Sequence, residues 1–184
     1  MSASKGRRIM AAGVFDLLHL GHVHYLTEAK KLGDELVVVV ATDVMVSKRK
    51  HQPIIDQDQR LALVAALKPV DMAILGSPHD QYVTVEALRP DVIALGYDDY
   101  HRAAEIRAQL NERGLGNVEV ARMPKFDVHD LNGTRKIVRR ILELYDPNAL
   151  AGDDGPNTAA AAPDADDVAR HDAAREEHAS EDNS

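Results

Sequence analysis

The 184-residue chain contains no cysteine, so disulfides, thiolate metal sites and cysteine nucleophiles are excluded. It also has no stretch near the roughly 18 consecutive apolar residues of a membrane-spanning helix, because its apolar runs are short, and the run at residues 36–41 has the length of a strand. Asp16, His19 and His22 interrupt the N-terminal region where a secretory signal would be apolar. We therefore expect a cytoplasmic protein that does not enter the membrane.

Acidic and basic side chains balance over most of the chain, so it has no excess of either charge there. Residues 1–150 hold 20 acidic and 20 basic side chains, whereas residues 151–184 hold 10 acidic side chains against Arg170 and Arg175. The net charge of −8 thus belongs to the C-terminal segment. A neutral body lacks the basic face with which general nucleic-acid binders release counterions, so we expect no nucleic-acid partner.

The composition divides the chain near residue 150. The whole chain is 45% hydrophobic, which is enough for one compact core. From Gly152 onward Ala, Asp, Glu, Pro and Asn dominate, and such a segment buries too little apolar surface to offset the entropy lost on ordering. We predict one catalytic domain over residues 1–150 and a disordered acidic tail over residues 151–184.

Short apolar runs alternate with amphipathic stretches along the first 150 residues. The apolar runs predict strands at 8–12, 36–41, 72–75, 92–95 and 118–122. The amphipathic stretches predict helices at 22–32, 57–67, 81–88, 101–113 and 134–145. Strands that alternate with helices pair in parallel through right-handed crossovers, so the pattern predicts a doubly wound, Rossmann-like α/β fold with a five-stranded sheet. Ligands of such sheets bind at the carboxyl ends of the strands.

Two common phosphate-binding motifs are absent as well, because neither a Gly-Lys-Ser/Thr loop nor a Gly-x-Gly-x-x-Gly turn follows a strand. The first strand leads instead into residues 13–22, where His19 and His22 flank Gly21 at the start of a helix. A helix N-terminus attracts phosphate, and two imidazoles add donors that can carry charge. The segment predicts an anion site. The alternative is that one histidine caps the helix while the other packs in the core.

The sequence Gly13-Val14-Phe15-Asp16 followed by His19-Leu20-Gly21-His22 resembles the signature of the cytidylyltransferase-like nucleotidyltransferases, whose H-x-G-H motif contacts the triphosphate. The resemblance implies that Val14, Phe15 and Asp16 line the nucleotide site. It also implies that His19 and His22 are catalytic residues that stabilise charge on the α-phosphate and on the departing pyrophosphate.

In nucleotidyl transfer the attacking phosphate oxygen is already ionised, so the obstacle is repulsion between two polyanions. Cations near the strand ends and a divalent cation, with Mg²⁺ expected, would reduce that repulsion. Lys48 and Arg49 follow the second predicted strand. The resemblance implies that Lys48 is catalytic and that Lys48 and Arg49 bind the phosphate of the second substrate. The alternative is a solvated basic loop.

Four more residues resemble binding positions of the same family. Arg60, near a helix start, resembles a position that faces the active site and binds substrate, and its alternative is a surface ion pair. Gly96 and Asp98 resemble a Gly-x-Asp segment that lies against the nucleotide, and their alternative is a polar turn. Thr134 resembles part of a phosphate-binding segment whose leading arginine and glutamate have no counterpart in residues 126–131. Its alternative is a simple N-cap.

Outside the first motif the chain resembles the archaeal FAD synthases. The matching runs are Lys48-Arg49-Lys50, Pro53-Ile54-Ile55, Gln59-Arg60, Leu67-Lys68-Pro69-Val70-Asp71, Ala73-Ile74-Leu75-Gly76-Ser77, Pro90-Asp91-Val92-Ile93 and Leu95-Gly96. The resemblance implies ATP and FMN as substrates, FAD and pyrophosphate as products, and a homodimer, which is usual in that family. Glycerol-3-phosphate cytidylyltransferase and a nucleotide-binding regulator without turnover remain the alternatives. The spacing of the other histidines predicts no metal site formed by the protein alone.

Overall fold

The computed structural model describes residues 6–48 and 52–145. The predictions for Arg49 and for the tail at 151–184 concern residues outside these ranges. The chain divides into two units, Met1–Ile141 and Leu142–Ser184. Every contact discussed below lies within the first unit.

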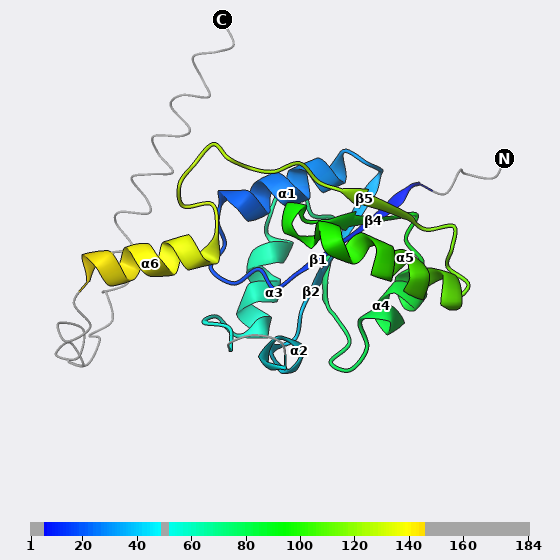
Figure 1. Cartoon of the computed structure of the whole chain (residues 1–184), viewed down its shortest axis with the longest axis horizontal. Helices are drawn as coiled ribbons and strands as arrows, with labels where there is room; N and C mark the ends of the chain where they lie inside the picture. The colour runs from blue at the N-terminus through cyan, green and yellow to red at the C-terminus, as the bar shows by residue number, and fades with distance from the viewer. Residues whose placement is uncertain (1–5, 49–51, 146–184) are drawn as a thin grey trace, which may run out of the picture. The chain divides into compact units, whose positions relative to one another are not determined.

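Five strands alternate with helices in the first unit (Figure 1). The strands are β1 (Arg8–Gly13), β2 (Glu35–Val40), β3 (Met72–Leu75), β4 (Val92–Leu95) and β5 (Glu119–Arg122). The helices are α1 (Leu20–Lys30), α2 (Asp43–Ser47), α3 (Gln57–Ala65), α4 (Gln81–Leu88), the 3-10 helix η1 (Tyr97–Arg102), α5 (Ala103–Glu112) and α6 (Thr134–Leu144), the last of which ends in the second unit. All ten predicted elements are present. The hydrophobic periodicity does not predict α2 and η1, because each is too short to establish a repeat.

The sheet has the order β3-β2-β1-β4-β5, and every neighbouring pair is parallel. This arrangement confirms the predicted doubly wound fold. The chain proceeds from β1 through β2 to β3 at one edge and then returns to place β4 on the other side of β1. The strand order therefore reverses between β1 and β4, and the carboxyl ends of these two strands are where a ligand is expected.

Apolar residues form a core on each face of the sheet. The buried residues of α1 and α3 pack on one face, and those of α4 and α5 pack on the other. In β1, Ile9 and Ala11 belong to the first core and Met10 belongs to the second, as the alternation of side chains along a strand requires. Burial on both faces explains why residues 36–40 of β2 form an unbroken apolar run.

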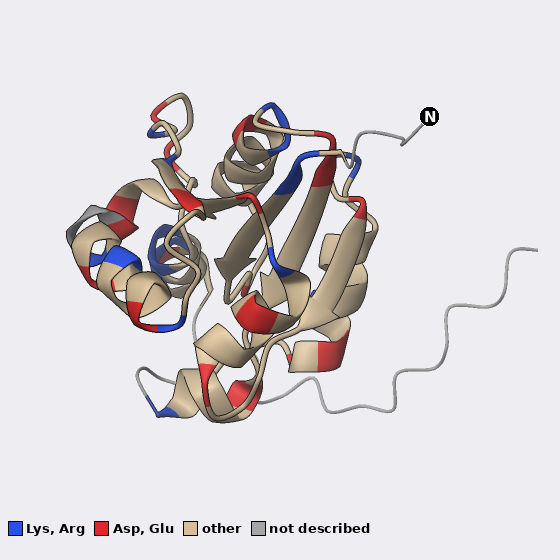
Figure 2. Ribbon diagram, turned by 90° about the vertical axis from the view of Figure 1, so that its right-hand side faces the viewer, with Lys and Arg blue, Asp and Glu red and all other residues tan. Residues whose placement is uncertain are grey.

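Charged residues of both signs are interspersed over the described elements and concentrate away from the middle of the strands (Figure 2). Some of them pair across neighbouring strands, as Arg8 does with Glu35 at a distance of 2.6 Å. The helices of the described part of the chain are all too short or too polar to cross a membrane.

Candidate active site

The loop after β1, residues 13–19, has a constrained backbone and is called the histidine loop below. Phe15 and Leu17 adopt left-handed conformations with φ of 57° and 46°, which are costly for side chains with a Cβ and are often found at functional sites. A Cβ on Gly13 would stand only 2.9 Å from the ring of Phe15, so the close approach of that ring requires glycine.

The position of the Phe15 side chain corrects the prediction that this residue lines the nucleotide site. The side chain is only 2% exposed, so its ring does not line a nucleotide site. The ring instead meets His22 edge-on, with 5.3 Å between centroids, and stacks on Tyr25 at 6.4 Å. Phe15 was recognised correctly as part of the motif, but its apolar ring gains more from burial than from contact with a polar ligand. It supports His22 from the core.

The two histidines lie together at the start of α1. His19 is the N-cap residue, and its Nδ1 accepts a hydrogen bond from the backbone N–H of His22 at 3.3 Å. The two rings stack with 3.8 Å between centroids and an angle of 18°. Because Nδ1 of His19 acts as an acceptor, the proton of the neutral ring belongs on Nε2, which can donate to a phosphate oxygen. His19 therefore caps the helix and still offers a donor.

Burial keeps both imidazoles uncharged at neutral pH. It lowers the pKa of His22 to about 4, with a further lowering from His19 and a partial opposing effect of Asp16. Burial also lowers the pKa of His19. A bound polyphosphate would favour the protonated rings, because a nearby anion raises the pKa of a histidine.

The start of α6 packs against the histidine loop and α1. The hydroxyl of Thr134 donates to the carbonyl oxygen of Asp16 at 2.8 Å. A Cβ on Gly21 would stand 2.6 Å from the carbonyl oxygen of Asn132, so this approach depends on glycine. The structure thus brings Thr134 to the histidine loop, although 112 residues separate it from His22, and its predicted contact with phosphate stays a prediction.

The carboxylate of Asp16 is engaged by the protein itself. Its two oxygens accept hydrogen bonds from the backbone N–H groups of Ile54, at 3.0 Å, and Ile55, at 3.1 Å. The predicted contact between Asp16 and the nucleotide therefore competes with bonds that fasten residues 54–55 to the histidine loop. The backbone of Val14 is similarly engaged, because its carbonyl oxygen accepts from Arg60.

The structure also corrects the prediction that Arg60 faces the active site and binds substrate. Its side chain is fully buried, with 0% exposure, and its donors bond to groups of the protein. A guanidinium in that position does not touch a substrate, and the surface ion pair considered as its alternative is wrong as well. The sequence places Arg60 correctly at the start of α3. The direction of its side chain, however, depends on three segments that surround it only in the folded chain.

The remaining predicted residues lie at the carboxyl ends of the strands. Lys48 is the C-cap residue of α2 and is exposed. Gly96 follows β4, and its carbonyl oxygen accepts a hydrogen bond from the N–H of Asp99 at 3.1 Å. Asp98 is exposed on η1. All three therefore follow the carboxyl ends of strands, with Lys48 beyond β2 and the other two beyond β4.

Three residues at this edge, Tyr25, Tyr97 and Arg122, were not predicted from the sequence. The hydroxyl of Tyr25 donates to the carbonyl oxygen of Ala94 at 2.9 Å, which ties α1 to the end of β4, and nothing in the spacing of the sequence indicates this contact. The guanidinium of Arg122 lies 4.2 Å from the ring centroid of Tyr97, where a cation–π contact is favourable. The position of Arg122 at the end of the fifth predicted strand was the available signal.

A cavity of about 90 Å³ opens beside the point where the strand order reverses. Ala12 and Gly96 line it at the strand ends, and Tyr82 from α4 and Arg102 from η1 line it on the other side. The buried hydroxyl of Tyr82 has no hydrogen-bond partner among the described residues. This cavity thus combines apolar walls with polar groups at the edge of the sheet where ligands bind.

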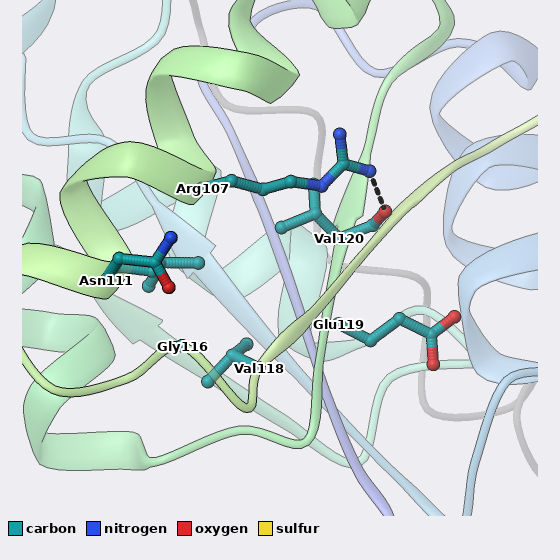
Figure 3. Close-up of a pocket in the computed structure, with 7 residues that line it drawn as sticks. Arg107, Asn111, Gly116, Val118, Glu119 and Val120 are labelled. Carbon is teal, nitrogen blue, oxygen red and sulfur yellow. Dashed lines mark hydrogen bonds between the residues drawn. The ribbon is translucent and has the colours of Figure 1, made fainter.

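A second cavity, of about 250 Å³, lies between α5 and the segment that leads into β5 (Figure 3). Arg107 crosses its rim and donates to the carbonyl oxygen of Val120 at 3.1 Å. The cavity also includes Gly116 and Glu119, which lie at the amino end of β5. The histidines are at the carboxyl ends of the strands, so this larger cavity is not part of the same site.

The side chains near the histidines suit a cation that is bound mainly by substrate. Among the described residues, no cluster of three or more histidines and carboxylates could hold a metal ion. Mg²⁺ commonly takes most of its ligands from phosphates and water, with one or two carboxylates from the protein. The exposed carboxylate of Asp98 is of the right chemical type for that contribution.

Comparisons with known proteins show the family to which the chain belongs. The cytidylyltransferase-like family model matches residues 10–151. The FAD synthase of Aciduliprofundum boonei is 53% identical over 139 residues, which cover 76% of this chain and 93% of the relative. The FAD synthase of Thermoplasma volcanium is 49% identical over 137 residues, which cover 74% and 95%. The chain belongs to the cytidylyltransferase-like family. It is a nucleotidyltransferase, and its relatives place it among the FAD synthases.

Two solved structures are also similar. A crystal structure from Thermoplasma volcanium, described as a lipopolysaccharide core biosynthesis protein, has a TM-score of 0.64 and 50% identity, and the match covers 67% of this chain and 100% of that chain. A protein of unknown function from Archaeoglobus fulgidus has a TM-score of 0.55 and 18% identity, with 64% and 89% covered. The second match concerns the fold alone.

Proposed function

We propose that this chain is an FAD synthase that transfers the adenylyl group of ATP to FMN and releases pyrophosphate. The observation that carries the proposal is the stacked pair of His19 and His22 at the start of α1, with Thr134 packed beside it. This arrangement occurs in a chain that is about half identical to FAD synthases over nearly their whole length.

The reaction joins two phosphates. A phosphate oxygen of FMN attacks the α-phosphorus of ATP, and the bond from that phosphorus to the oxygen bridging to the β-phosphate breaks. The departing pyrophosphate keeps the electron pair of that bond. The N–H groups at the start of α1, Nε2–H of His19 and the ring of His22 stabilise the charge that develops there. Lys48 offsets the charge of the FMN phosphate.

A divalent cation, Mg²⁺ by preference, would accompany the triphosphate and neutralise part of its charge. Its ligands would be mainly phosphate oxygens and water, with Asp98 as the protein carboxylate available at the same edge. The homodimer and the cytoplasmic location expected from the sequence stay predictions.

The proposal is tested by incubating the protein with Mg²⁺ and each of four pairs, ATP or CTP with FMN or glycerol 3-phosphate. Pyrophosphate release and product formation are measured by a coupled assay and by chromatography. Only ATP with FMN is expected to react, and FAD is expected as the product. Reaction of only CTP with glycerol 3-phosphate would reverse the substrate assignment. Nucleotide binding without pyrophosphate in any mixture would favour the regulator.

The role of the histidine pair is tested by His22→Ala. Loss of a fixed group that stabilises developing charge is expected to lower kcat by a factor of about 100 or more, with a Tm close to that of the wild type. His24→Ala is the matched control, because His24 lies two residues further along α1 and packs on Phe126, with 5.0 Å between ring centroids. Near-normal turnover by His22→Ala would reject its catalytic role.

A further inference from the structure

The buried guanidinium of Arg60 joins segments that lie far apart in the sequence. Its Nε donates to the carbonyl oxygen of Ile55 at 2.9 Å. One terminal nitrogen donates to the carbonyl oxygen of Val14, in the histidine loop. The other donates to the carbonyl oxygen of Ala41, the residue after β2, at a distance of 2.9 Å. One side chain on α3 therefore holds the loops after β1 and β2 against each other.

Asp43 extends this network to α2. Its Oδ1 accepts a hydrogen bond from Arg60 at 2.6 Å, and its Oδ2 accepts the backbone N–H of Gln57 at 3.2 Å. The side-chain oxygen of Gln57 accepts the backbone N–H of Asp43 at 3.0 Å in return. These bonds fix the first residue of α2, the helix that ends beside Lys48, to the start of α3 (Figure 1).

Asp16 supplies a second connection from the histidine loop. Its carboxylate accepts the N–H groups of Ile54 and Ile55, and the carbonyl oxygen of Ile55 also accepts from Arg60. The two connections meet at residues 54–55. A network in which each polar group is satisfied by several partners is rigid, because moving one segment breaks bonds in the others.

We propose that Arg60 is a positioning residue, which through Asp43 and Asp16 sets the distance between the histidine pair and Lys48. This inference rests on the proposed function, in which the histidines handle the phosphates of ATP and Lys48 handles the phosphate of FMN. Arginine is required because its planar guanidinium bonds four acceptors in fixed directions, whereas lysine is a point charge with fewer donors. A change in the distance between the two phosphates slows in-line attack more than it weakens the binding of either substrate.

The test compares Arg60→Lys with the wild type in steady-state turnover and in separate binding measurements. FMN binding is followed by flavin fluorescence, and ATP binding by calorimetry with α,β-methylene-ATP, which cannot be cleaved at the reacting bond. For Arg60→Lys we expect kcat to fall roughly 100-fold while both dissociation constants change little. Asp43→Asn should give the same pattern, and the double variant should be hardly slower than either single variant because both act through one network.

Val64→Ala is the matched control for stability, since Val64 lies one turn further along α3 in the core and is 0% exposed. It should lower the Tm and leave kcat unchanged in assays well below every Tm. A kcat for Arg60→Lys that matches this control would overturn the proposal. A weaker affinity for FMN with an unchanged kcat would do so too, because it indicates direct contact.

Failure of the proposed function is seen separately, in the wild type. If the wild type is inactive with ATP and FMN but uses CTP and glycerol 3-phosphate, the same comparison of kcat with binding is made with that pair. The positioning role is then judged by the same outcomes, since it concerns the distance between two phosphates and not the rest of the acceptor.

Discussion

His22 combines two demands on a single side chain. In the proposed function it must lie close to the phosphates, and its ring is also held between the core residue Phe15 and the ring of His19. Burial lowers its pKa to about 4, so the free protein holds it uncharged at neutral pH. A neutral ring costs less to bury than a charged one and can still donate a hydrogen bond to phosphate. The same burial has a measurable consequence for stability.

We expect part of the acid sensitivity of this protein to come from His22. Well above pH 6.5 the residue is neutral in both the folded and the unfolded chain and contributes no dependence on pH. As the pH falls from 6.5 to about 4, the unfolded chain binds a proton that the folded chain does not, so the free energy of unfolding decreases. The loss from this residue amounts to about 3 kcal/mol and levels off at lower pH.

Urea denaturation of the wild type and His22→Ala over this pH range measures that loss. The variant lacks the titrating ring, so the stability of the wild type relative to the variant should decrease between pH 6.5 and 4. Two parallel stability curves would show that the folded protein does not depress the pKa of His22.

At the scale of elements, the site depends on how closely α1 approaches the start of α6. Gly21 is the second residue of α1, and a Cβ on it would meet the carbonyl oxygen of Asn132 and Nδ1 of His19. Any residue with a Cβ at this position would hold α1 and Asn132 further apart. The glycine of the H-x-G-H motif is therefore required for the close contact between α1 and the residues that precede α6.

Gly21→Ala is expected to separate stability from activity. Alanine favours a helix by up to about 1 kcal/mol over glycine, which offsets part of the packing cost. Its Cβ would nevertheless stand 2.6 Å from a backbone oxygen and 2.9 Å from the His19 ring, so both must shift. We expect a Tm near that of the wild type and a kcat lower by roughly 100-fold, measured by pyrophosphate release. Leu20→Ala, at an adjacent exposed position, should behave as the wild type, and equal activity of both variants would contradict this account.

At the scale of the whole molecule, the described part of the chain is organised by one parallel sheet. The central position of β1 puts the loop after it between the loops that follow β2 and β4. Residues that the proposed function assigns to different substrates therefore reach a common edge from both sides. The strongly acidic segment at 151–184 follows this unit in the sequence and has no counterpart in the chemistry proposed for it.

A chain that ends at residue 150 tests this separation. The truncation removes ten acidic residues and two arginines and changes the net charge from −8 to 0. The truncated chain should therefore elute earlier than the full chain from an anion exchanger. We expect the kcat, the KM values and the Tm to remain those of the full chain, because the cores on both faces of the sheet are formed before residue 150. A marked loss of Tm would show that the acidic segment contributes to the folded state.

Much of the fold followed from local sequence. Unbroken apolar runs and the helices between them predicted each strand of the sheet within one residue, since strand burial and helix periodicity are properties of neighbouring residues. The same reasoning missed α2, which has only five residues and is held by the cap of Thr42 and by the distant Gln57. Short elements of this kind depend on contacts more than on pattern.

The sequence by itself determined the class of chemistry, because His19, Gly21 and His22 are neighbours at a helix start whatever the rest of the chain does. The direction of Arg60 and the packing of Phe15 were decided only by the tertiary structure. Thr134 reaches Asp16 across 118 residues of sequence, and Arg60 reaches Val14 across 46. No local pattern records such distances, because the energy of a buried side chain depends on the groups that folding places around it.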